Sequence, residues 1–189
     1  LNSNYPIRQF VGHLSDVEIV TFHPNGFYLI TSSNDKTIRM WCIESGECVR
    51  IFVNKSEFGY VNTINFTSNG KLLLASSEST LMIYDIVRLG DCIKIINNLC
   101  YGTINTICID SDDNMISIAN NNNEIMLLKF NELINDLEKQ IIDFKNQSKI
   151  AYKYKYHTKK SPVMLMKFNQ NNLLFCLSRF EDVNTKIFI

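Results

Sequence analysis

The sequence lacks an excess of charge of either sign. Its 189 residues contain 19 Lys plus Arg and 19 Asp plus Glu, so the formal net charge is zero. Binding to nucleic acid through phosphate neutralisation needs an excess of cations, so any contact with DNA is expected to be indirect at most. Proline (3) and glycine (7) are scarce as well, which excludes collagen-like and linker-rich classes.

Long apolar runs are missing too. No run approaches the roughly 18 residues that span a bilayer, and residues 1–30 show no basic start followed by an apolar stretch. Neither a membrane segment nor a signal peptide is therefore expected. The six cysteines include no C-x-x-C pair and the three histidines are scattered. We expect reduced, mostly buried thiols and no metal site.

Motifs of common enzymes are also absent. The sequence has no G-x-S-x-G, no phosphate-binding P-loop, no H-E-x-x-H and no G-x-G-x-x-G. We therefore predict no catalytic residue, no cofactor and no small-molecule substrate.

What the sequence does contain is a repeat of 43 to 44 residues. A turn sequence recurs at residues 22–26, 66–70 and 110–114. A pair of markers six residues apart recurs with it: Asp35 and Trp41, Glu78 and Tyr84, Asn122 and Leu128. Three coincident markers on one period indicate a repeat architecture.

Each repeat is expected to form four short strands. In the first repeat they are roughly Val17–Phe22, Phe27–Ser32, Thr37–Cys42 and Glu47–Val53, separated by turn residues. Asn25-Gly26 is a hairpin signal, because both residues tolerate positive φ. Four-stranded units at this period are typical of propeller blades.

Two motifs in the first repeat identify the type of blade. Gly12-His13 and the segment Ser33–Trp41 resemble the WD-repeat family, whose signature is a Gly-His pair, a Ser-x-Asp turn and a closing Trp-Asp. The resemblance implies an all-β WD40-repeat propeller that serves as a protein-interaction scaffold. It also implies a buried hydrogen-bond network of His13, Ser33, Asp35 and Trp41. The other repeats depart from the pattern, so we expect them to rely on apolar packing.

We interpret residues 1–189 as one propeller domain of about four blades. Its parts are expected to be an outer strand of a preceding blade at 5–13, blades at 14–53, 54–97 and 98–156, and an incomplete last blade at 157–189. The last blade would place a third strand at Thr185–Ile189. Because WD propellers usually have seven blades and the chain does not begin with Met, we favour a piece of a larger ring. A self-closed ring of four blades is the alternative.

An insertion interrupts the third blade. Apolar residues recur at helical spacing, which predicts an amphipathic helix over 130–147: Phe130, Leu133, Ile134, Leu137, Ile141 and Phe144. The helix would pack on its own propeller or, alternatively, dock a partner subunit.

The densest basic stretch follows the insertion. Tyrosines alternate with cations between residues 152 and 157, so a strand would separate them onto two faces. Lys153, Lys155, Lys159 and Lys160 form a possible contact stripe for phosphates or an acidic partner. The alternative is an outer blade strand that its lysines protect from edge pairing.

A narrower similarity covers nearly the whole chain. Segments 5–17, 48–52 and 158–163 are similar to the last blades of a WD-repeat subunit of the general transcription machinery. This similarity implies a nuclear scaffold in pre-initiation complex assembly, with histone-fold factors among its partners. The candidate contact residues are Asp16, Asn34, Tyr60 and Tyr101. The alternatives are a WD-repeat adaptor of a splicing or ubiquitin-ligase complex, and a propeller hydrolase with carboxylates at the mouth of a channel.

Overall fold

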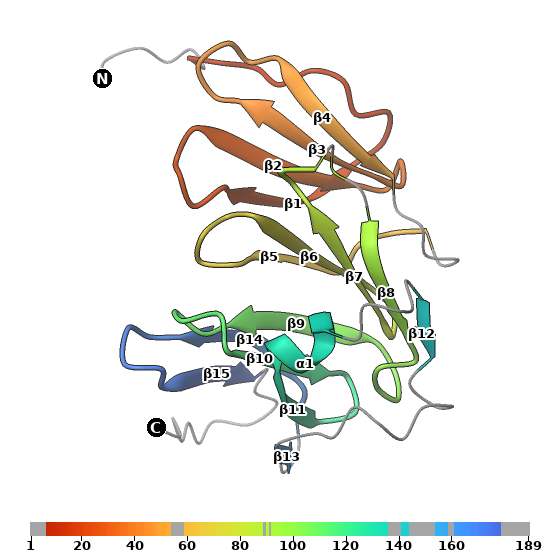
Figure 1. The fold of residues 1–189 in the computed structure, drawn as a ribbon. Coiled ribbons are helices and arrows are strands. Elements are labelled where there is room, and N and C mark those ends of the chain that lie inside the picture. The colour runs from red at the N-terminus through yellow and green to blue at the C-terminus, as the bar shows by residue number, and fades with distance from the viewer. Residues whose placement is uncertain are drawn as a thin grey trace. The chain divides into compact units, whose positions relative to one another are not determined.

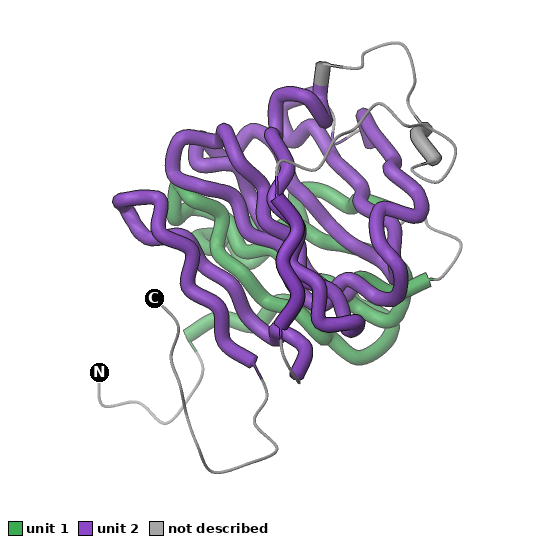
Figure 2. Tube along the Cα trace, turned by 90° about the horizontal axis from the view of Figure 1, so that it is seen from below, with its two compact units in different colours: residues 1–61 green, residues 62–189 purple. Residues whose placement is uncertain are grey.

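The structure is a computed structural model. It describes residues 7–53, 59–88, 90, 92–135, 141–143, 154–158 and 161–178. The chain divides into two compact units, unit 1 at residues 1–61 and unit 2 at residues 62–189 (Figure 2).

Unit 1 is one antiparallel sheet, which we call sheet I. Its strands are β1 (Val17–Phe22), β2 (Tyr28–Ser33), β3 (Thr37–Cys42) and β4 (Cys48–Val53), hydrogen-bonded in chain order. The tight turn before β2 contains Gly26 at φ 75°, a left-handed conformation that glycine adopts without a steric cost. These bounds lie within one residue of those expected from the sequence.

Unit 2 begins with sheet II, which follows the same pattern (Figure 1). Its strands are β5 (Thr63–Phe66), β6 (Leu72–Ser77), β7 (Thr80–Asp85) and β8 (Cys92–Asn97). A fifth strand, β12 (Ile141–Asp143), joins the outer edge of β8 in parallel orientation. It comes from the insertion about 45 residues further along the chain.

Sheets III and IV complete unit 2. Sheet III contains β9 (Ile104–Ile109), β10 (Met115–Asn120), β11 (Glu124–Lys129) and, on its outer edge, β13 (Tyr154–His157). Sheet IV is the hairpin of β14 (Val163–Phe168) and β15 (Leu174–Ser178). The predicted strand at 185–189 lies outside the described residues. Four-stranded antiparallel sheets, with one short helix among the described residues, confirm the predicted all-β class of WD-type blades.

Three sheets of unit 2 pack face to face around apolar side chains. Sheets II and III share a core to which Leu74 and Ile83 contribute from one side and Ile107 and Met126 from the other. A second, smaller cluster joins sheets III and IV and contains Cys108, Ala119, Ile125, Val163 and Met166. Burial of these faces stabilises the stack, at about 25 cal/mol for each Å² of apolar surface removed from water.

Polar side chains connect the turns between the first and second strands of neighbouring sheets in unit 2. Ser68 donates its hydroxyl to Asp113 Oδ2 at 2.7 Å, and Ser111 donates to Asn172 Oδ1 at 2.7 Å. Both acceptor residues have positive φ. These bonds recur at the turn between the first and second strands of successive repeats. They therefore hold each sheet to the next one at that turn.

The insertion differs from the predicted helix over 130–147. Among the described residues of this range, helix α1 covers Phe130–Asn135 and β12 is a strand, whereas residues 136–140 and 144–147 lie outside the described residues. The backbone of β12 pairs with the outer strand of sheet II, and such pairing outweighs the weak helical preference of the Ile141-Ile142 pair. Phe130 and Leu133 of α1 are buried in the core of unit 2, so the helix packs on its own domain.

The outer strand predicted at 5–13 is not present in the described part of that range. Residues 7–13 carry no strand, and residues 5 and 6 lie outside the described range. An extended segment becomes a strand only when a neighbour completes its backbone hydrogen bonds. This one is held by side chains instead: the Phe10 ring lies edge-on to Trp41 with centroids 5.9 Å apart, and His13 bonds to sheet I.

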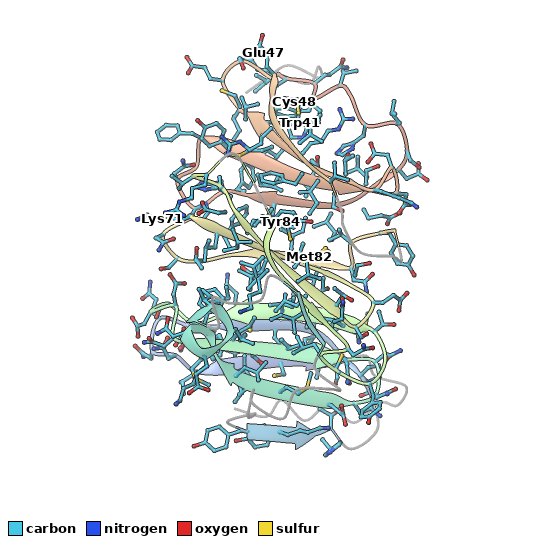
Figure 3. All side chains as sticks on the ribbon, turned by 45° about the vertical axis from the view of Figure 1, so that its right-hand side comes forward. Trp41, Glu47, Cys48, Lys71, Met82 and Tyr84 are labelled. Atoms are coloured by element: carbon cyan, nitrogen blue, oxygen red, sulfur yellow. The ribbon has the colours of Figure 1, made fainter. Side chains whose placement is uncertain are left out.

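The three repeat markers occupy equivalent places. Trp41, Tyr84 and Leu128 are each the fifth residue of the third strand, and each is at most 1% exposed. Each faces the second residue of the strand before it. Figure 3 shows Trp41 and Tyr84 within their sheets. The repeat read from the sequence is therefore a structural repeat.

Candidate functional site

A polar network connects sheet I to residues 7–16, which precede β1 and which we call the approach segment of unit 1. His13 Nε2 lies 2.6 Å from Thr31 Oγ1, and Trp41 Nε1 donates to the same oxygen at 2.8 Å. The other ring nitrogen, His13 Nδ1, lies 2.9 Å from Asp35 Oδ2. The indole N–H can only donate, and the directions of the two imidazole bonds follow the tautomer of His13.

Asp35 is the most highly coordinated member of this network. Its carboxylate accepts the Thr37 hydroxyl at 2.6 Å, the Thr37 amide at 2.9 Å and the Leu14 amide at 3.0 Å. Burial by itself raises the pKa of Asp35, but hydrogen bonds from Thr37, Leu14 and His13 outweigh burial and hold it well below its usual value. The charged carboxylate therefore fixes the turn before β3.

The structure brings three of the four predicted network residues together and replaces the fourth. Thr31, not Ser33, supplies the hydroxyl between His13 and Trp41. Ser33 lies two residues further along β2, where its hydroxyl donates to the Ser15 carbonyl at 3.1 Å and accepts from the Asp35 amide at 3.1 Å. Ser33 therefore supports the turn before β3 and does not link the imidazole of His13 to the indole of Trp41.

A guanidinium covers the network from one side. Arg39 lies 6.0 Å from the centroid of Trp41 and 3.8 Å from Asp35 Oδ2. A Cβ on Gly12 would come within 2.5 Å of Arg39 Nη1, and Gly12 has φ 157°. Glycine at this position lets the approach segment pass directly over the arginine, a contact that the Gly-His motif had not indicated.

Sheets II and III do not repeat this network at the equivalent positions. The residues in the place of Thr31 are Ala75 and Ile118, the fourth residues of β6 and β10. Neither can bridge an imidazole and a ring N–H, and both are fully buried. Apolar packing takes the place of hydrogen bonds in these two sheets.

Sheet III has a different polar cluster at its own turn. Asn120 is fully buried; it donates to the Tyr101 carbonyl and to Glu124 Oε2, both at 2.9 Å. Glu124 also pairs with Lys155 of β13 at 2.7 Å. Burial raises the pKa of Glu124, yet hydrogen bonds from Lys155 and Asn120 bring it below its usual value. The cluster thus connects the loop before β9 to the outer strand of the sheet.

The predicted contact residues lie at corresponding ends of sheets I and III. In unit 1 the Asn34 amide donates to the Asp16 carbonyl at 3.0 Å, and Asn34 Nδ2 donates to Glu18 at 2.9 Å. Tyr60 follows Gly59, which lies against the turn that contains Asn34: a Cβ added at Gly59 would lie 3.0 Å from Cε of Lys36 in that turn. In unit 2 Tyr101 is 69% exposed. Each residue therefore borders the turn between the second and third strands of its sheet or the loop that enters it.

The basic stretch is only partly described. Lys155 points to Glu124 from β13, the outer strand of sheet III, whereas Lys153, Lys159 and Lys160 lie outside the described residues. Tyr154 and Tyr156, on the other face of β13, stack with ring centroids 6.3 Å apart. The sequence singled out the lysines of this stretch; in the structure it is the tyrosines that form a defined surface.

Two features are missing from the residues that the structure describes. Among them, no group of three or more His, Cys, Asp or Glu side chains is placed to hold a metal ion. None of the helices they form is long and apolar enough to cross a membrane.

Comparison with known proteins agrees with the repeat. Residues 4–42 and 46–85 match the family described as WD domain, G-beta repeat. The chain is 26% identical to transcription initiation factor TFIID subunit 5 of Caenorhabditis elegans, over 90% of this chain and 27% of that protein. It is 28% identical to the WD repeat domain-containing protein 83 homolog of Dictyostelium discoideum, over 55% of this chain and 31% of that protein.

A third relative is the guanine nucleotide-binding protein subunit beta of Arabidopsis thaliana, which is 35% identical over 42% of this chain and 22% of that protein. The chain thus spans between 22% and 31% of the length of these relatives. The two segments that match the family are WD repeats, and the chain as a whole is similar to a TFIID subunit at low identity.

Proposed function

We propose that this chain, which carries WD repeats, is a non-enzymatic scaffold within the general transcription factor TFIID, where it supports assembly of the RNA polymerase II pre-initiation complex. One observation carries the proposal: the similarity to TFIID subunit 5 extends over 90% of the chain, whereas the two other relatives described above cover 55% and 42% of it. The partners would be other TFIID subunits, histone-fold factors among them, and the protein would act in the nucleus.

Preorganisation is the physical basis of such a role. The turn that presents Asn34 is fixed by Asp35 and by a backbone hydrogen bond from Asn34 to the Asp16 carbonyl. The loop that presents Tyr101 is held by two asparagine side chains at 2.9 Å. A surface that is already ordered binds a partner without a large entropic cost, and exposed tyrosines are frequent anchors of protein interfaces.

Affinity purification of the full-length gene product from nuclear extract tests the proposal. We expect other TFIID subunits to copurify, and their yield to fall by about tenfold for a variant with Asn34→Ala and Tyr101→Ala. The matched control is Val87→Ser, because Val87 is 68% exposed and follows β7 at the opposite end of sheet II. Copurification of a different assembly in place of TFIID would contradict the proposal.

The second candidate is a WD-repeat adaptor of another assembly, such as a splicing or ubiquitin-ligase complex. It is favoured by the range of relatives that match part of the chain, which include subunit I of eukaryotic translation initiation factor 3 and a target of rapamycin complex subunit. The same purification separates the two candidates, because each predicts a different set of copurifying subunits.

A further inference from the structure

Asparagine is followed by glycine at two places in this chain, in equivalent turns of successive repeats. Asn25-Gly26 lies between β1 and β2, and Asn69-Gly70 lies between β5 and β6. In each turn the glycine amide donates to the carbonyl three residues before it at 2.9 Å. In each, the asparagine Oδ1 accepts the amide two residues further along, at 3.0 Å and 2.8 Å respectively. The two turns therefore have the same local conformation.

An asparagine side chain that precedes glycine can react with its own backbone. The amide nitrogen of Gly26, once its proton has passed to solvent, bonds to Cγ of Asn25. Both groups belong to one turn, and glycine carries no side chain that would shield its nitrogen. The side-chain nitrogen leaves as ammonia and a cyclic imide remains. Water then opens either carbonyl of the imide and gives aspartate or isoaspartate, so the reaction needs no reagent other than water.

Tertiary contacts hold the turn of sheet II. The Thr67 hydroxyl donates to Asn69 Oδ1 at 2.9 Å. Ser68 donates both its amide and its hydroxyl to the carboxylate of Asp113 in sheet III, each at 2.7 Å. Gly70 is buried. The imide can form only when this turn opens locally, and each of these bonds makes that opening rarer.

The equivalent turn of sheet I is built from different side chains. Pro24 stands in the place of Ser68, and proline has neither an amide hydrogen nor a hydroxyl to donate. His23 stands in the place of Thr67, and its Nδ1 accepts the backbone amide of Asn25 at 3.2 Å. Asn25 and Gly26 are both exposed, and a Cβ added at Gly26 would meet no other part of the described chain within 4 Å. Solvent base and water therefore reach the reacting groups.

We propose that Asn25 is a modification site, which converts to aspartate and isoaspartate through an imide with Gly26, whereas Asn69 in the equivalent turn persists. The conversion places a negative charge between β1 and β2. Isoaspartate also lengthens the main chain by one carbon, so the tight turn that joins the two strands must change. This inference does not depend on the scaffold role proposed above.

Ageing of the full, folded chain at mildly alkaline pH tests the inference. Trypsin places the two asparagines in different peptides, residues 9–36 and 56–71, and tandem mass spectrometry measures conversion at each position. We expect Asn25 to convert about tenfold faster than Asn69, because additional hydrogen bonds must break before the second turn opens. An isoaspartyl methyltransferase with labelled S-adenosylmethionine should mark the peptide 9–36.

The unfolded chain is the first control. In concentrated guanidinium chloride the two asparagines should convert at rates within about twofold of each other, since both precede glycine and the tertiary contacts are lost. Asp113→Gly is the second control. It removes the acceptor of both Ser68 bonds, and glycine keeps the positive φ of 56° at this position. The rate at Asn69 should rise severalfold in this variant, and the rate at Asn25 should stay the same.

Three results would overturn the inference. The first is conversion of Asn69 as fast as that of Asn25 in the folded chain. The second is an intact Asn25 in the folded chain under conditions that convert it in the unfolded chain. The third comes from Asn25→Gln, whose longer side chain would have to close a larger ring: an undiminished methyltransferase signal in peptide 9–36 of this variant would place the modification at another residue.

Discussion

Trp41 Nε1 donates a hydrogen bond to Thr31 Oγ1 at 2.8 Å inside sheet I. Trp41 is 1% exposed and Thr31 is 6% exposed, so neither group can exchange this bond for water. The same oxygen bonds to His13, which ties the segment before β1 to the strands. The Thr31 hydroxyl therefore joins Asp35 in holding the approach segment of unit 1 to sheet I.

Thr31→Val should destabilise unit 1 by about 1–3 kcal/mol, because the methyl group leaves the indole N–H and the imidazole without their shared partner. The fluorescence of Trp41, the only tryptophan of the chain, reports the transition in urea. Thr21→Val on the neighbouring β1 is the control and should change the midpoint little. Equal midpoints for the Thr31 variant and the parent would show that the network contributes nothing to stability.

Stability of unit 1 should depend on pH through Asp35. The pKa of Asp35 is held well below its usual value in the folded state, so the unfolded chain binds its proton first as pH falls. The stabilisation is complete above the unfolded pKa of about 3.9 and is lost progressively below it. Urea midpoints measured from pH 6 to pH 2.5 should fall more steeply for the parent than for Asp35→Asn. Parallel curves would contradict this assignment.

The thiols should differ in reactivity. Burial raises the pKa of Cys100 to about 11 and that of Cys108 to about 12. Hydrogen bonds from the Ser45 amide and hydroxyl lower the pKa of Cys42. Because the thiolate is the nucleophile, brief alkylation with iodoacetamide at pH 8 should label Cys42 well before the other two. Mass spectrometry of tryptic peptides measures the order.

Ser45→Ala is the matched variant for this experiment, because it removes one of the donors to Cys42 and leaves the buried thiols untouched. It should slow labelling of Cys42 and leave Cys100 and Cys108 unchanged. Labelling of Cys108 before Cys42 in the native protein would contradict the burial described for sheet III.

The bond between Ser68 and Asp113 should couple sheets II and III. In a double-mutant cycle, Ser68→Ala and Asp113→Ala should show an interaction free energy of about 0.5–1 kcal/mol, modest because the pair is exposed to solvent. Chemical denaturation of unit 2 measures it. Ser111→Ala combined with Asp113→Ala is the control cycle and should be additive, because Ser111 bonds to Asn172. Additivity in both cycles would remove the pair as a connection between the sheets.

Local sequence determined the repeat and its strands. The six-residue step from a turn residue to Trp41 or Tyr84 reflects the fixed rise of a strand after a tight turn, so spacing translates directly into position.

Sequence could not choose between Thr31 and Ser33 as the hydroxyl that bridges His13 and Trp41. Two residues apart on β2, they project from the same face, and only the register with β3 and the approach of His13 bring Thr31 between the rings.

The insertion shows the same division between local and tertiary information. The chain by itself specified apolar residues at helical spacing, and a helix does begin at Phe130. Only the tertiary structure decided that residues 141–143 form strand β12 beside β8 and do not continue the helical pattern. The reason is that an open sheet edge supplies hydrogen bonds that no local pattern encodes. The tertiary structure likewise decided that Tyr154 and Tyr156 would stack at an edge: alternation fixed their common face, and the pairing of β13 with β11 fixed where that face lies.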